Sequence, residues 1–146
     1  MTRRGEEIAS RARRLVGIRF RPQGRDPSYG LDCIGTAAAA AGVPADQVRR
    51  DYALRGQKRA EIEEGLCDLG FQPVPGGEAE AGDILVCSAG PAQVHVVVRT
   101  EEGFVHADAR LRMVVERPLP LPWPAESVWR RAGGDRDFES DSKGGV

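Results

Sequence analysis

The sequence lacks the features that mark several large classes of protein. It has only three cysteines among 146 residues, an odd number without close spacing, so a disulfide framework is not expected. No apolar run reaches the roughly 18 residues of a membrane-spanning helix, and the first residues lack the hydrophobic segment of a signal peptide. We therefore expect a soluble chain, made in the cytoplasm, with at least one free thiol and no membrane partner.

The sequence also lacks an excess of charge of one sign. Lys and Arg number 21 and Asp and Glu 22, so the formal net charge of -1 offers no broad electrostatic footprint for a nucleic acid. No glycine-rich phosphate loop is present, and no CxxC or HxxxH pair indicates a metal site. We expect no nucleic-acid partner, no cofactor and no metal. One alternative stays open, a zinc ion held by Cys33, Cys87, His95 and His106.

Helical periodicity comes first along the chain and strand periodicity second. Apolar spacing predicts helices at about 5–16 and 57–69, and small residues after the capping residue Asp32 predict a short helix that begins at Cys33. Short apolar or alternating runs predict the strands of an antiparallel sheet, at 84–87, 94–99, 104–107, 111–116 and 127–130. This order predicts an α+β fold, with N-terminal helices packed on a C-terminal sheet of about five strands.

The composition predicts one domain followed by a tail. Hydrophobic residues make up 40% of the chain, enough to fill one compact core, which we assign to residues 1–132. Four prolines between 118 and 124 cannot all belong to a sheet ladder, so this segment is expected to be an extended surface connector. Residues 133–146 are rich in Gly, Asp and Ser, which predicts a disordered tail.

Cys33 is the candidate nucleophile among the three cysteines. At the first turn of a helix, unpaired backbone N–H groups and the helix dipole can lower the pKa of a thiol and make it reactive. Cys67 lies in a helical pattern and Cys87 at the end of an apolar run, where cysteines usually act as small hydrophobic residues. The same structural role is the alternative for Cys33.

The only two histidines, His95 and His106, both fall in the predicted sheet. If Thr-Glu-Glu-Gly between their strands forms a hairpin with a two-residue loop, both side chains lie on one face, directly opposite or diagonal to each other. One ring could then orient the other, as the base of a cysteine hydrolase requires. A three-residue loop with a bulge would separate them, and each histidine alone could equally be a half-buried strand residue.

Four segments in order resemble the NlpC/P60 cysteine peptidases. These are GIRFRPQGRDPSYGLDCIG, EAEAGDILVC, VHVVVR and GFVHAD, and the match covers about residues 5–117. The resemblance implies a papain-like fold in which Cys33 is the nucleophile, His95 the general base and His106 the residue that orients the base. It further implies hydrolysis of peptidoglycan stem peptides at the bond between γ-D-glutamate and a diamino acid.

The resemblance also implies a set of substrate-binding positions. Asp32 stands where members place an acidic residue that helps to bind the peptide stem. Phe20 stands where many members have a tyrosine, whose hydroxyl Tyr29 could supply, and Ile34 replaces the common serine. The compact form and the segment LPWPAESVWRRA resemble the cell-wall peptidases of phage tails, prophages and gene transfer agents. This implies tail proteins as partners and incorporation into a phage-like particle.

Two other functions remain open at this point. A structural or tail-assembly protein could retain the fold without turnover, and the changes at Phe20 and Ile34 favour this. An amidase or acyltransferase could use the same Cys-His centre on another acyl group.

Overall fold

The chain forms its helices first and most of its strands second, as the periodicity predicts. A computed structural model describes residues 3–48, 59–76, 78–91 and 93–131, so the predicted tail at 133–146 lies outside the described residues. The helices are α1 (Arg3–Arg14), α2 (Cys33–Ala40) and α3 (Arg59–Asp68), with a 3-10 turn η1 (Ala45–Gln47). The strands are β1 (Arg25–Asp26), β2 (Gly30–Leu31), β3 (Phe71–Pro73), β4 (Ile84–Gly90), β5 (Gln93–Arg99), β6 (Gly103–Asp108), β7 (Met113–Pro118) and β8 (Ala125–Arg131).

The main sheet has six strands in the order β3-β8-β4-β5-β6-β7, and all neighbours are antiparallel. Five of these strands were predicted, and the sixth, β3, pairs with β8. Its three residues include Pro73 and are too few to show an alternating pattern. Because β7 is the last strand of this order and β8 lies between β3 and β4, residues 119–124 must carry the chain from one edge of the sheet to the strand next to the opposite edge.

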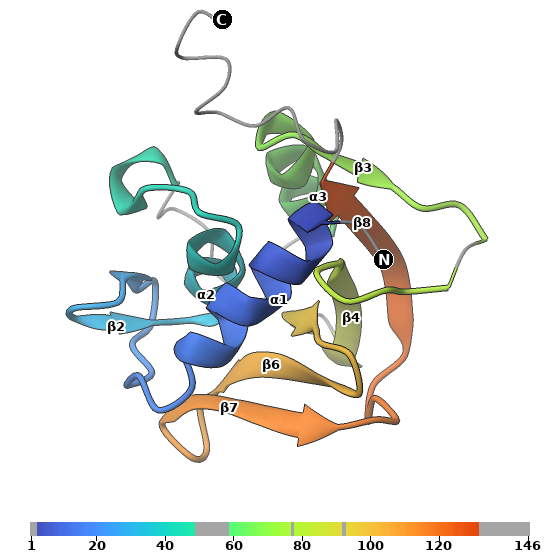
Figure 1. The fold of residues 1–146 in the computed structure, drawn as a ribbon. Helices are drawn as coiled ribbons and strands as arrows, with labels where there is room; N and C mark the ends of the chain where they lie inside the picture. The colour runs from blue at the N-terminus through green and yellow to red at the C-terminus, as the bar shows by residue number, and fades with distance from the viewer. Residues whose placement is uncertain (1–2, 49–58, 77, 92, 132–146) are drawn as a thin grey trace, which may run out of the picture.

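The two faces of the sheet pack against different partners. One face carries Val86 and Val98, and α1 and α2 cover it with Ile8 and Ala37 in the main core (Figure 1). The opposite face carries a smaller cluster of Leu85, Cys87, Val97 and Phe104. This division follows from the alternation of side chains along a strand, and each fully buried valine contributes roughly 1.5–3 kcal/mol of hydrophobic free energy. The sheet is therefore apolar on both sides.

Small residues bring α2 close to its neighbours. The helix reads CIGTAAAA, and its alanines at 37, 38 and 40 are buried. Gly35 faces the loop before the helix, where an added Cβ would run into the carbonyl oxygen of Gly24. The first turn of α2 and the loop that leads to it are therefore packed backbone against backbone.

The segment after α1 covers the edge of β7. Helix α1 ends at Arg14, two residues earlier than predicted, and Gly17 has a positive φ of 97° that turns the chain. The amide of Gly17 then donates to Val114 O at 2.8 Å, and the amide of Phe20 donates to Arg112 O at 3.0 Å. No helix in the described ranges is long and apolar enough to cross a membrane.

Candidate active site

Cys33 is the first residue of α2, as the sequence predicts. Asp32 before it has extended backbone angles, and its Oδ1 accepts a hydrogen bond from the amide of Gly35 at 2.8 Å, which is the geometry of an N-cap. The Cys33 side chain is only 1% exposed and packs in the main core together with Val96 of β5. The thiol therefore lies where the start of α2 meets the sheet.

Asp32 also organises the loop that leads to Cys33. Its Oδ1 accepts from Arg25 Nη1 at 2.7 Å, and its Oδ2 accepts from the backbone amide of Gln23 at 3.1 Å. Both charged side chains are buried, so this ion pair is shielded from water and either partner alone would leave a costly buried charge. These contacts favour a positioning role for Asp32, and its predicted part in substrate binding stays a prediction.

His95 and His106 form a hydrogen-bonded pair. The amide of Thr100 donates to Gly103 O, so Glu101 and Glu102 form the two-residue loop that the same-face argument requires. In this register the two histidines are diagonal neighbours on one face of the sheet, and His95 Nε2 lies 2.9 Å from His106 Nδ1. The predicted juxtaposition of the two rings is confirmed.

Trp123 covers both imidazole rings. Its ring centroid lies 4.7 Å from that of His95 and 5.3 Å from that of His106, both in edge-to-face orientation. Trp123 belongs to the proline-rich connector, whose path between β7 and β8 brings it over the histidine pair. The sequence predicts an extended surface connector here, and the structure adds that its Trp123 packs on the histidine pair. Prolines keep this segment out of the sheet ladder, so the presence of a large aromatic residue in it is the sequence signal that the segment packs against the face of the sheet.

Burial holds the candidate catalytic groups in their neutral forms. Burial, followed by the negative charge of Asp32, raises the pKa of Cys33 to about 12, against smaller opposing effects of the Val96 backbone and Arg25. Burial, followed by His106, lowers the pKa of His95 to about 4. The expectation that the helix start would lower the pKa of the thiol is therefore wrong for this conformation. Desolvation of the charged form outweighs the favourable field of the helix.

One cavity of about 830 Å³ connects the thiol with the histidine pair. Cys33, His95, His106 and Trp123 all line it. Within the described part of the chain, however, no hydrogen bond joins the Cys33 thiol to either imidazole.

The alternation along β5 explains this separation. Val94 and Val96 pack in the main core with Cys33, whereas His95 pairs with Cys87 on the opposite face. The cavity at the end of the sheet is what joins the two sides. Cys33, His95 and His106 therefore line one cavity, but among the described residues the hydrogen bond between the two histidines does not extend to Cys33.

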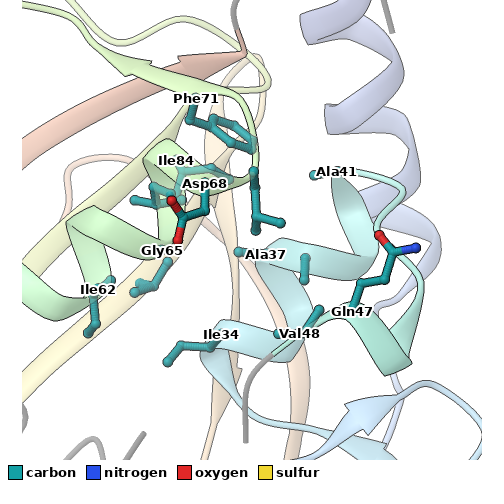
Figure 2. A pocket seen from close by; sticks show the side chains of 14 residues that line it. Ile34, Ala37, Ala41, Gln47, Val48, Ile62, Gly65, Asp68, Phe71 and Ile84 are labelled. Carbon is teal, nitrogen blue, oxygen red and sulfur yellow. The ribbon is translucent and has the colours of Figure 1, made fainter. Parts of the chain in front are cut away.

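The predicted substrate-binding residues divide into two groups. Phe20 and Asp32 line the cavity with Cys33. Tyr29 is 66% exposed and, like Ile34, is not among the described residues that line this cavity. Ile34 instead lines a separate apolar pocket of about 120 Å³ between α2 and α3, opposite Ile62 (Figure 2).

Several cavity residues were not singled out from the sequence. They are Gln93, Asp108, Arg110, Arg117, Pro122 and Trp123, together with small residues near the turn after β6. Asp108 favours the protonated forms of His95 and His106 by its charge. Among the described residues, no group of three His, Cys, Asp or Glu side chains lies close enough to hold a metal ion. Cys33 and Cys87, two of the ligands considered for zinc, pack on opposite faces of the sheet.

Comparison with known proteins gives matches to structures alone. No protein-family model and no curated protein matches the sequence. NlpC1 from Trichomonas vaginalis is similar with a TM-score of 0.62 and 20% identity, covering 87% of this chain and 45% of NlpC1. The peptidoglycan hydrolase RipB from Mycobacterium tuberculosis has a TM-score of 0.56 and 20% identity, covering 87% of this chain and 64% of RipB.

A third structure is the NlpC/p60 domain of the peptidoglycan hydrolase SagA. It has a TM-score of 0.54 and 21% identity, and the match covers 78% of this chain and 88% of that domain. The chain spans about half the length of the Trichomonas proteins, 45% of NlpC1 and 47% of NlpC2. With its helices packed on a six-stranded antiparallel sheet, this chain has the α+β fold of the NlpC/P60 domains, as its motifs predict.

Proposed function

We propose that this protein is a cysteine peptidase that hydrolyses peptidoglycan stem peptides at the bond between γ-D-glutamate and the diamino acid. One observation carries the proposal: a hydrogen-bonded pair of histidines shares a cavity with a cysteine at a capped helix start. The similarity in fold to the peptidoglycan hydrolases RipB and SagA supports the substrate class. Cys33 is the proposed nucleophile, His95 the base and His106 the residue that orients the base.

The chemistry would follow the course of acyl transfer to a thiol. His95 Nδ1 would take the proton of Cys33 as the sulfur attacks the scissile carbonyl, and the amine would leave with a proton returned by the imidazolium. The backbone amide of Cys33, at the start of α2, would stabilise the oxyanion, and water would then hydrolyse the thioester. Because the thiol and imidazole are neutral at rest, the proton moves during attack rather than beforehand.

This course requires His95 to approach Cys33. The imidazole lies on the face of β5 away from the thiol, so the thiol and His95 Nδ1 would approach each other across the cavity while His95 Nε2 keeps its hydrogen bond to His106. Catalytic hydrogen bonds are often long or unformed in a ligand-free enzyme and close when substrate binds. A peptide in the cavity would thus complete the contact that the resting conformation lacks.

A second candidate function is a structural protein that retains the fold without turnover. The buried neutral thiol and the missing hydrogen bond between Cys33 and His95 favour it. The hydrogen bond between His95 and His106 speaks for catalysis, since one ring orients the other.

One experiment separates the two functions. Purified protein is incubated with L-Ala-γ-D-Glu-diaminopimelate muropeptides, and the products are identified by mass spectrometry. Cleavage by the wild type and by Cys67→Ala, but not by Cys33→Ala, supports the peptidase. Cys67 is an exposed residue of α3 and provides the matched control. Intact muropeptides in every reaction would favour the structural protein.

We further propose that the protein is synthesised in the cytoplasm and acts within a phage-like tail. The resemblance of the Pro- and Trp-containing segment LPWPAESVWRRA, which includes β8, to that of tail-associated peptidases supports this setting. Mass spectrometry of purified particles from the source organism tests it, with infection by particles that carry Cys33→Ala as the functional measure. Absence of the protein from particles would contradict the proposed setting but leave the peptidase untouched.

A further inference from the structure

The cavity has two arginine side chains that the proposed chemistry does not use. Arg110 and Arg117 both line it, and within the described residues neither guanidinium donates to a protein acceptor. Arginines elsewhere in the chain do: Arg130 binds the carboxylate of Asp83 through two nitrogens at 2.9 Å. Guanidinium groups prefer planar, bidentate acceptors such as carboxylates. The cavity therefore presents two cations that no side chain of the described protein neutralises.

The charges around the cavity add up in favour of an anionic ligand. Asp32 is neutralised by its ion pair with Arg25, and His95 is neutral because its pKa is lowered to about 4. Among the described residues that line the cavity, Asp108 is the remaining acidic one, and its Oδ1 already accepts hydrogen bonds from two backbone amides. Against this single negative charge stand two guanidinium groups. A substrate that carries a carboxylate would thus meet a net positive surface.

Arg110 is an exposed residue of a turn whose backbone is fixed by Asp108. Asp108 Oδ1 accepts hydrogen bonds from the amides of Arg110 at 2.9 Å and Leu111 at 3.0 Å, which fixes the backbone of the turn. The same turn is joined to the loop before Cys33, because Arg112 O accepts from the amide of Phe20. Phe20, Cys33 and Arg110 all line the cavity.

Arg117 lies on β7, near His106 of the histidine pair. In the pairing of β6 with β7, Arg117 is opposite Phe104. Phe104 precedes His106 by two residues, so both lie on the same face of the sheet. Its positive charge contributes to lowering the pKa of His106, as expected of a nearby cation. Arg117 is thus placed beside β6, and Arg110 follows in the turn after this strand.

We propose that Arg110 binds a free carboxylate next to the scissile amide, with Arg117 adding positive potential to the same cavity. This inference rests on the proposed function and narrows its substrate. A γ-linked glutamate leaves its α-carboxylate free beside the bond that is cut. The protein would therefore select stem peptides whose glutamate is a free acid and discriminate against the α-carboxamide, which cannot form an ion pair with a guanidinium.

The test compares two peptides that differ only at this group. L-Ala-γ-D-Glu-diaminopimelate and its α-carboxamide analogue are titrated into Cys33→Ala protein by calorimetry, and their kcat/KM values are measured on the wild type. We expect the Cys33→Ala protein to bind the free acid about tenfold more tightly than the amide. Arg110→Gln, added to Cys33→Ala, should remove most of this preference. Arg112→Gln, on the same turn but outside the cavity lining, should retain it.

Each outcome decides between the two proposals. Equal binding of both peptides, binding of neither, or an unchanged preference in Arg110→Gln would overturn the carboxylate site. Equal kcat/KM values for both peptides would overturn it while leaving the peptidase intact. A preference for the free acid that depends on Arg110, in a wild type that cleaves neither peptide, would support the carboxylate site and reject the proposed function.

Discussion

His95 Nε2 and His106 Nδ1 lie 2.9 Å apart, and this one contact determines which nitrogen of His95 can act as a base. A neutral imidazole has one N–H donor and one acceptor. If His95 Nε2 donates to His106 Nδ1, the lone pair of His95 Nδ1 is free for the thiol proton. In the opposite arrangement His95 Nδ1 carries a proton and cannot be the base. The proposed mechanism therefore requires the first tautomer.

Nitrogen NMR checks this tautomer. We expect a protonated Nε2 and an unprotonated Nδ1 for His95 at pH 7, and His106→Ala should mix the two forms. Because the wrong tautomer and a misoriented ring both impair proton transfer, kcat of His106→Ala should fall by about 100-fold or more. A protonated Nδ1 in the wild type would contradict His95 as the base.

The reactivity of Cys33 should be low in the resting protein. The thiolate is the nucleophilic form, and burial raises the pKa of Cys33 to about 12. At pH 8 iodoacetamide should therefore label Cys33 about a hundredfold or more slowly than the exposed Cys67, as followed by peptide mapping. Equal labelling rates would mean that the thiolate is already formed.

The raised pKa of Cys33 also has a consequence for stability at high pH. The unfolded thiol has an ordinary pKa of 9.0, whereas burial raises the pKa of the folded thiol to about 12. Between these values the unfolded chain has lost a proton that the folded chain still holds, so the free energy of unfolding falls as the pH rises. Cys33→Ala should lessen this fall in chemical denaturation series from pH 8 to 11.

Trp123 should control the ionisation of His95. Its ring packs against both imidazoles and helps to keep water away from them, and burial is the main cause of the lowered pKa of His95. In Trp123→Ala the pKa of His95 should rise from about 4 towards 6.5 in an NMR titration. Trp129→Phe, which alters a buried tryptophan of the main core, should leave it unchanged. A rise in both variants would indicate general loosening instead.

Asp32 should affect stability more than substrate affinity. Asp32→Asn keeps a residue that can cap α2 but removes the buried negative charge that forms an ion pair with Arg25. The free energy of unfolding measured in urea should fall by about 3–5 kcal/mol. A variant with unchanged stability and a raised KM would instead support the predicted role of Asp32 in binding the peptide stem.

Local sequence signals predicted the parts of the site that depend on neighbouring residues. Asp32 at the helix start and the two-residue loop at Glu101–Glu102 each fix a local geometry, which then places Cys33 and pairs His95 with His106. The α+β order of elements follows from the change in hydrophobic period for the same reason.

Features that depend on distant packing could not be predicted in this way. The protonated state of Cys33 results from burial against β5, and no signal near Cys33 in the sequence reports this burial. The place of Trp123 depends on β8 lying between β3 and β4, which is a property of the whole sheet. Arg110 enters the cavity because the turn after β6 is joined to the loop at Phe20.

The hydrogen bonds between residues 17–20 and β7 have a consequence for when the site can exist during synthesis. The loop that leads to Cys33 is anchored on Val114 and Arg112, so an early segment depends on one that the ribosome makes much later. Contacts between segments that are distant in the sequence form late, because the two segments must first be brought together by closing the long loop between them. We therefore expect a nascent chain that ends before β7 to lack the cavity. Any cleaving activity should begin only after the β6–β7 hairpin has emerged from the ribosome.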